Sequence, residues 1–102
     1  MFGISTKEIK AMKNKYEIIQ DWNNSEDYKR LSHLQTLIIK TYESVNIKTD
    51  LTGRRIEDNF ILENNLEDFQ VFFKPEIFDK LKDWCKEYKM LCEKENKVFD
   101  SL

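Results

Sequence analysis

The amino-acid sequence predicts a mainly helical α+β fold in one small globular domain, residues 1–102. The chain contains only two glycines and one proline, which leaves few turns and favours long secondary-structure elements. Apolar residues recur at helical spacing in three segments, whereas a fourth segment fits a β-hairpin better. We therefore expect two amino-terminal helices, a hairpin and a long carboxy-terminal amphipathic helix. An all-helical bundle of about four helices is the alternative.

The first predicted helix carries an amino-terminal capping signal. The run Ser5-Thr6-Lys7-Glu8 matches the capping box, in which the Ser and Glu side chains bond the backbone N–H groups that a helix start leaves without partners. Apolar residues then follow helical spacing and predict a helix over about residues 6–20. The polar residues 21–25 indicate a break, with Asn24 or Ser25 as the cap of the next helix.

Two longer helices are predicted on either side of the hairpin segment. The second helix covers about residues 26–45 and is followed by a polar connection over residues 46–53. The last helix begins at Pro75, because proline is favourable in the first helical turn, and continues to about residue 95. Its apolar residues share one face, which makes it the clearest amphipathic element of the chain.

Residues 54–73 fit a hairpin better than a single helix, because their apolar side chains would scatter around a helix. The turn would lie at Asn64-Asn65, since asparagine tolerates the positive φ angle of a two-residue turn. Asp58 and Glu67 would then share the apolar face, which counts against the hairpin. That register pairs Phe60 with Phe69 and Ile56 with Phe73, and it turns Ile61, Leu66 and Phe72 outward.

The predicted core draws apolar side chains from all four elements. It consists of Ile9, Tyr16, Ile19, Leu34, Ile38, Phe60, Phe69, Phe73, Ile77, Leu81, Trp84 and Tyr88.

No motif in the sequence predicts catalysis, a cofactor or a metal site. His33 is the only histidine, and with two cysteines it supplies too few ligands for a structural zinc site. Cys85 and Cys92 would lie about 10 Å apart on a helix, beyond the reach of a disulfide. We interpret both cysteines as small core residues and His33 as an exposed helix residue. We expect a protein that is not an enzyme and needs no cofactor and no metal.

One uninterrupted acidic run, residues 57–68, is the main candidate for a binding surface. An acidic, partly apolar surface attracts a basic partner by electrostatic steering and holds it by apolar contact. The alternative interpretation is that these charges keep a sheet edge soluble. We expect a protein–protein interaction protein of the inhibitor, adaptor or regulator type, whose partner-binding residues are Glu57, Asp58, Glu63, Glu67 and Asp68.

A nucleic-acid-associated regulator is the second functional hypothesis. Its phosphate contacts would come from Lys7, Lys10 and Lys13 on the first helix and from Arg54 and Arg55. The net charge of -2, from 17 basic and 19 acidic residues, argues against a general nucleic-acid binder and against a polybasic membrane-surface protein. Self-association through an exposed part of the last helix is a further alternative.

The composition also carries information about the source of the protein. Ile, Lys and Asn are abundant and alanine occurs once, which indicates an AT-rich genome such as that of a low-GC bacterium, its phages or its mobile elements. No segment approaches the roughly 20 apolar residues of a membrane helix, and no secretory signal is recognisable. We expect a cytoplasmic protein, in its own cell or in a host cell.

Overall fold

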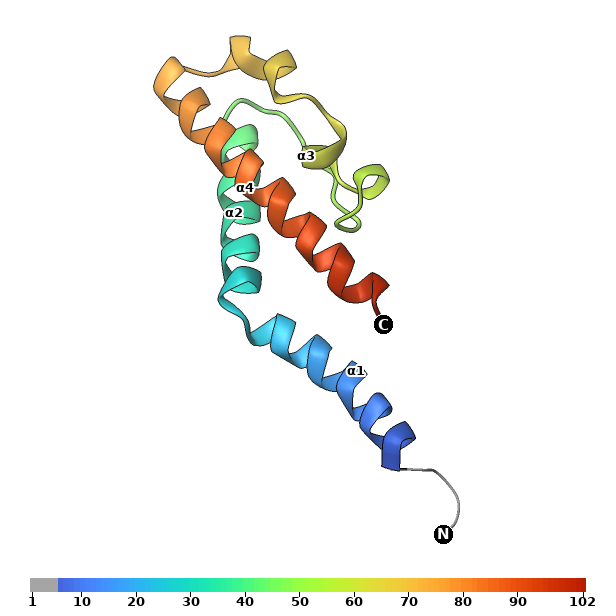
Figure 1. Cartoon of the computed structure of the whole chain (residues 1–102). Helices are drawn as coiled ribbons and strands as arrows, with labels where there is room; N and C mark the ends of the chain where they lie inside the picture. Colours follow the sequence, from blue (N-terminus) through green and yellow to red (C-terminus); the bar gives the residue numbers. More distant parts are fainter. Residues whose placement is uncertain (1–5) are drawn as a thin grey trace.

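The structure is a computed structural model that describes the backbone of residues 6–102 and the side chains of residues 14–102. Helices α2 and α4 run antiparallel, side by side, and α1 projects from one end of this pair (Figure 1). None of the helices in the described part is long and apolar enough to span a membrane. The elements are α1 (Thr6–Asn24), α2 (Glu26–Glu43), η1 (Ile56–Asp58), α3 (Phe60–Glu63), η2 (Leu66–Phe72) and α4 (Pro75–Asp100).

The helix boundaries follow local sequence signals. Ser25 is the predicted cap of α2, and its Oγ accepts the N–H of Tyr28 at 3.1 Å. Pro75 begins α4 as predicted, although α4 continues to Asp100 rather than ending near residue 95. The first helix also extends further than predicted, through residues 21–24. The predicted capping box and the core prediction for Ile9 lie outside the residues whose side chains are described.

Asn46 ends α2 in a left-handed conformation, with a φ angle of 63°. The N–H of Ile47 bonds the carbonyl of Tyr42 at 3.0 Å, and the N–H of Asn46 bonds the carbonyl of Glu43 at 2.9 Å. These two bonds form the Schellman pattern, which satisfies carbonyls that the end of a helix leaves without partners. Asparagine suits this position because it adopts the left-handed region more readily than other non-glycine residues.

The predicted hairpin at Asn64-Asn65 is wrong, and the mainly helical alternative is confirmed at the level of secondary structure. Residues 54–73 form η1, α3 and η2, and residues 6–102 contain only one isolated bridge, between Leu51 and Asn59. The Oδ1 atom of Asn59 accepts the N–H groups of residues 61 and 62 at 3.0 and 3.3 Å, which starts a helical turn. Asn64 and Asn65 have φ angles of -97° and -83°, so neither adopts the conformation that the predicted turn requires.

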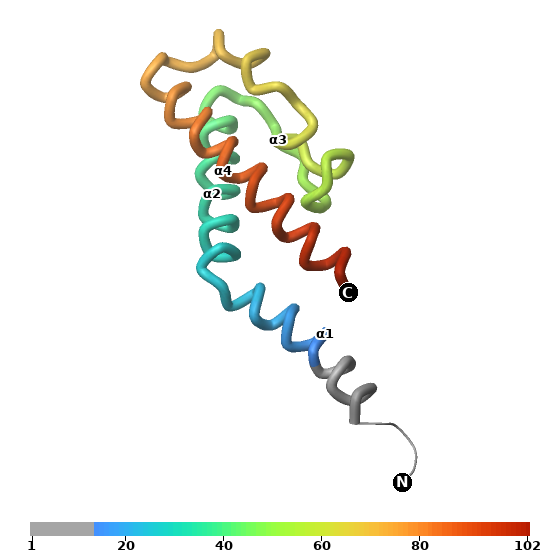
Figure 2. The backbone as a smooth tube through the Cα atoms, viewed as in Figure 1, coloured from blue at the N-terminus to red at the C-terminus, as the bar shows by residue number. Residues whose placement is uncertain are grey.

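The segment between α2 and α4 descends beside α4 and then returns to the start of that helix (Figure 2). Its aromatic residues surround Tyr42 of α2. The rings of Phe60, Phe69 and Phe73 lie 5.6 to 5.8 Å from the Tyr42 ring in edge-to-face contacts. Phe60 and Phe69, the predicted hairpin pair, do lie 5.7 Å apart, but they meet through this cluster and not across a ladder.

Other side chains of this segment differ from the hairpin prediction. Ile61 and Leu66, expected to point outward, are only 2% and 8% exposed. Ile56, expected to pair with Phe73, is 65% exposed. The helical turns, and not an alternation of inward and outward residues, decide which side chains face the core.

The hydrophobic core lies mainly between α2 and α4. Burial of each large aliphatic side chain there contributes roughly 1.5–3 kcal/mol to stability. The predicted core residues that are fully buried are Leu34, Ile38, Leu81 and Tyr88. The predicted core residues that are partly buried against this core are Phe60, Phe69, Phe73 and Trp84.

Two further core predictions are wrong. Tyr16 is 71% exposed and belongs to α1, the helix that projects away from the α2–α4 pair (Figure 1). Ile77 is 41% exposed in the first turns of α4. Ile19 is half-buried. Trp22, predicted to lie in a break between helices, is instead buried at the end of α1. Within residues 14–24, burial of α1 therefore increases toward its carboxy-terminal end.

Candidate interaction surface

Four carboxylates line one surface depression beside α3, with a volume of about 290 Å³. They belong to Asp50, Glu57, Asp58 and Glu63, and we call this depression the acidic hollow. Its remaining lining comes from Thr52, Asn59 and Phe60. The hollow therefore combines concentrated negative charge with one aromatic residue.

Backbone pairing holds the two sides of the acidic hollow together. The N–H of Phe60 bonds the carbonyl of Asp50 at 3.1 Å, and the N–H of Thr52 bonds the carbonyl of Asp58 at 2.9 Å. Asn59 is 1% exposed, and its amide donates to the carbonyl of Gly53 at 3.0 Å and to the Tyr88 hydroxyl at 2.8 Å. The buried side chain of Asn59 therefore connects the hollow to Tyr88 of α4.

The carboxylates of the acidic hollow are available to a partner. Within the described side chains, no basic nitrogen lies within the 4.0 Å salt-bridge distance of any of the four. Arg55 lies near the hollow, but its guanidinium donates to Asp100. This hydrogen bond raises the pKa of Arg55, and the charges of Glu57 and Asp58 contribute smaller increases. An incoming cation would relieve the repulsion among the clustered carboxylates.

The structure divides the five predicted partner-binding residues into two groups. It brings Glu57, Asp58 and Glu63 into the acidic hollow, whereas Glu67 and Asp68 lie exposed in the first turn of η2 and do not line it. The sequence prediction missed Asp50, because this residue precedes the acidic run. Only the pairing of residue 50 with residue 60 places it beside the others.

Of the five basic residues of the nucleic-acid hypothesis, the structure describes the side chains of Arg54 and Arg55, and both form ion pairs within the protein. The guanidinium of Arg54 donates to Glu95 at 2.8 Å and to Gln35 at 3.3 Å, and its side chain is 21% exposed. Arg54 also lies over the ring of Tyr28, 5.6 Å from its centroid. Its charge is therefore used inside the protein and is not offered to a phosphate. Lys7, Lys10 and Lys13 lie outside the residues whose side chains are described.

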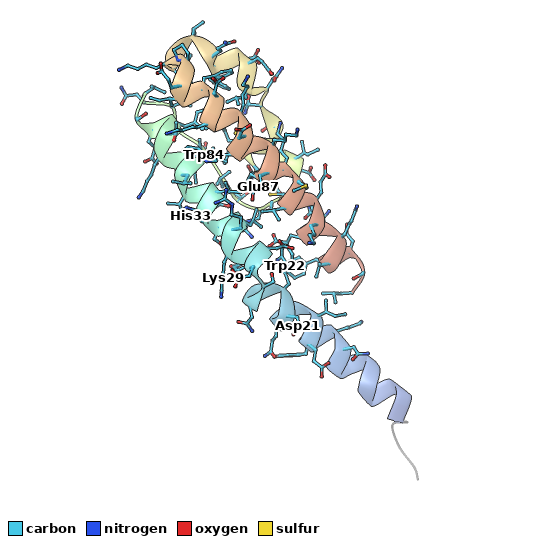
Figure 3. The ribbon with its side chains drawn as sticks, turned by 60° about the vertical axis from the view of Figure 1, so that its left-hand side comes forward. Asp21, Trp22, Lys29, His33, Trp84 and Glu87 are labelled. Carbon is cyan, nitrogen blue, oxygen red and sulfur yellow. The ribbon has the colours of Figure 1, made fainter. Side chains whose placement is uncertain are left out.

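Arg54 belongs to a buried polar network that connects α1 with α3. At one end the indole N–H of Trp22 donates to Glu95 Oε2 at 2.7 Å, and Figure 3 shows Trp22 where α1 meets the helix pair. Gln35 accepts hydrogen bonds from Arg54 and from the Tyr88 hydroxyl, the latter at 3.0 Å. Tyr88 in turn accepts from Asn59, the residue behind the acidic hollow. Burial raises the pKa of the Tyr88 phenol, so this hydroxyl stays protonated.

The two cysteines are buried free thiols, at 5% and 1% exposure for Cys85 and Cys92. Burial raises the pKa of each thiol to about 11. Both are therefore protonated and poorly nucleophilic at neutral pH. Among the described residues, no group of His, Cys, Asp and Glu side chains has an arrangement that could hold a metal ion.

The chain matches no protein-family model, and neither a curated protein nor a solved structure matches it significantly. Its function is therefore inferred from its own residues and their geometry.

Proposed function

We propose that this protein is a small, non-enzymatic interaction protein that binds a basic region of a protein partner through the acidic hollow. It would act as an inhibitor, adaptor or regulator in the cytoplasm of its own cell or of a host cell. The observation that supports this proposal is that four acidic residues line one hollow together with Phe60, and that no basic side chain among residues 14–102 forms a salt bridge with any of them. A lysine or arginine side chain of the partner would place its charge among the carboxylates and its aliphatic stem against the ring.

The expected interaction depends on salt, because the carboxylates are near the surface. Exposed ion pairs contribute only about 0.2–1 kcal/mol each, so several charges and the contact with Phe60 must act together. Long-range attraction of the basic partner increases the association rate, and added salt screens it. The affinity should therefore fall as the ionic strength rises, mainly through a slower association rate.

The test begins with affinity capture from a lysate of a low-GC bacterium, with and without nuclease, followed by titration of the purified partner. The hollow variant Glu57→Lys/Glu63→Lys should weaken binding at least tenfold. The matched control is Glu67→Lys/Asp68→Lys, which changes the net charge equally at exposed residues outside the hollow. It should retain most of the affinity.

Three outcomes would contradict this proposal. If both variants weaken binding equally, then the total negative charge and not the hollow is responsible. If neither variant changes binding, the partner uses another surface. A captured complex that disappears after nuclease treatment would favour the nucleic-acid-associated regulator.

A further inference from the structure

A second depression, of about 340 Å³, follows the groove between α2 and α4. It shares no lining residue with the acidic hollow. Figure 3 shows Trp84 on the side of α4 that borders α2. We call this depression the α2–α4 groove; its lining residues are Leu37, Lys40, Thr41, Ser44, Ile77, Lys80 and Trp84.

The floor of the α2–α4 groove is apolar. Leu37 and Trp84 are half-buried, and Ile77 is 41% exposed. The hydroxyl of Thr41 donates to the carbonyl of residue 37 at 2.7 Å, and that of Ser44 donates to the carbonyl of residue 41 at 2.6 Å. Since both hydroxyl protons are used within α2 and its cap, the groove offers mainly hydrocarbon and indole surface. Surface of this kind forms the centre of protein–protein interfaces.

Positive charge borders this apolar floor on both helices. Lys40 on α2 and Lys80 on α4 are exposed, and within residues 14–102 neither ammonium lies within 4.0 Å of a carboxylate. Lys82, on another side of α4, is by contrast paired with Asp79 at 3.6 Å. The two lysines of the groove therefore favour a partner that carries Asp or Glu residues beside its apolar surface.

The shape of the groove favours a helix as this partner. Two antiparallel helices leave a groove that accepts the side-chain ridge of a third helix, as in helical bundles. Ile77 and Trp84 are seven residues apart on α4, or roughly 10 Å, which matches the i and i+7 anchors of a docked helix. Further along, a bidentate pair between Arg30 and Glu87, at 2.8 and 3.0 Å, bridges the two helices beyond Trp84.

We propose that the α2–α4 groove binds an amphipathic helix of a protein partner whose apolar stripe packs on Trp84 and Ile77 and whose flanking carboxylates pair with Lys40 and Lys80. This site is independent of the acidic hollow, since it uses other residues and selects the opposite charge. The protein would then join two partners, or two parts of one partner.

The proposal is tested with the purified full chain and a synthetic amphipathic helical peptide that carries Leu at helical spacing and Glu on both flanks. Binding is followed by the amide chemical shifts of residues 37–44 and 77–84. The Glu peptide should bind at least tenfold more tightly than the same peptide with Lys flanks. It should also bind more tightly than a scrambled peptide of equal composition, which lacks the apolar stripe.

The variant Lys40→Glu/Lys80→Glu should reverse the preference between the two peptides. Lys86→Glu/Lys97→Glu, on other faces of α4, is the matched control and should leave the preference unchanged. The Glu57→Lys/Glu63→Lys variant of the acidic hollow should bind the Glu peptide like the wild type, so the two proposals fail separately. Absence of binding by the Glu peptide, equal binding of the scrambled peptide, or tighter binding of a DNA oligonucleotide would overturn the helix proposal.

Discussion

Replacement of Glu95 by glutamine tests the buried network directly, because one carboxylate oxygen links α1 to the segment before α3. Glu95 is 7% exposed, and its Oε2 accepts from Trp22 at 2.7 Å and from Arg54 at 2.8 Å. The Glu95→Gln variant keeps the shape of the side chain and one acceptor oxygen, but it removes the negative charge. Arg54 would then lose its only carboxylate partner among the described residues.

The expected cost follows from the burial of both partners. Removing one member of a buried ion pair costs about 3–5 kcal/mol, and one hydrogen bond to a charged group is worth about 1.5–3 kcal/mol. Arg54 remains 21% exposed, so water partly solvates it, and the glutamine oxygen can still accept one bond. We therefore expect a loss of about 2–4 kcal/mol, a large part of the roughly 5–15 kcal/mol that stabilises a small domain.

The assay is urea unfolding followed by far-ultraviolet circular dichroism, which does not depend on Trp22 fluorescence. Glu93→Gln, an exposed neighbour on α4, is the matched control and should change stability by less than about 0.5 kcal/mol. Trp22→Phe, which keeps an aromatic ring but removes the N–H donor, should cost less in the Glu95→Gln background than in the wild type. If Glu95→Gln unfolds within about 0.5 kcal/mol of the wild type, the carboxylate does not hold the network together.

Three further predictions concern Asn46, Asn59 and the two cysteines. Asn46→Ala should lower the free energy of unfolding by about 1 kcal/mol, because alanine adopts the φ angle of 63° less readily than asparagine does. Asn46→Gly should not lower it, because glycine has no Cβ to strain at this angle; equal urea midpoints for the two variants would refute this reason. Asn59→Ala should cost about 2–3 kcal/mol in the same assay, since it leaves the buried N–H of Ile61 without a partner and removes one of the two hydrogen bonds of the Tyr88 hydroxyl. Burial raises the pKa of the Cys85 and Cys92 thiols to about 11, whereas a cysteine of the unfolded chain has a pKa of ~8.5. The two protonated thiols therefore stabilise the folded state fully below pH ~8.5, and this stabilisation is lost as the pH rises toward 11. The free energy of unfolding in urea should be lower at pH 10 than at pH 8, and Cys85→Ala/Cys92→Ala should reduce this difference. If the double variant shows the same difference between the two pH values, the thiols are not its cause.

Local signals in the sequence were sufficient for the start of two helices. Ser25 lies directly before α2 and Pro75 at the start of α4, where their side chains act on the backbone of the adjacent turn. The same kind of reasoning failed for residues 54–73. There the side chain of Asn59 starts a helical turn, while the two asparagines of the expected hairpin adopt negative φ angles. An asparagine is compatible with a cap, a turn or a loop, so its sequence position alone does not select among them.

The candidate site was predicted in part. The acidic run identified Glu57, Asp58 and Glu63. It also included Glu67 and Asp68, which lie in the first turn of η2 and do not line the hollow. The apolar spacing of α4 likewise placed Ile77 in the core, although it lies exposed in the α2–α4 groove. A helix with apolar residues over a wide arc does not specify which part of that arc meets its neighbour.

The sequence by itself determined the helical character of α2 and α4, the start of each, and their core stripes around residues such as Ile38 and Leu81. These features depend on interactions between residues within one or two helical turns, which a linear pattern records. The tertiary structure alone decided that Trp22 meets Glu95, 73 residues away, and that Arg54 joins them from 41 residues away. Many carboxylates of the chain are chemically able to accept these hydrogen bonds. The packing of the helices in the folded chain brings the Glu95 carboxylate within reach of the Trp22 and Arg54 donors.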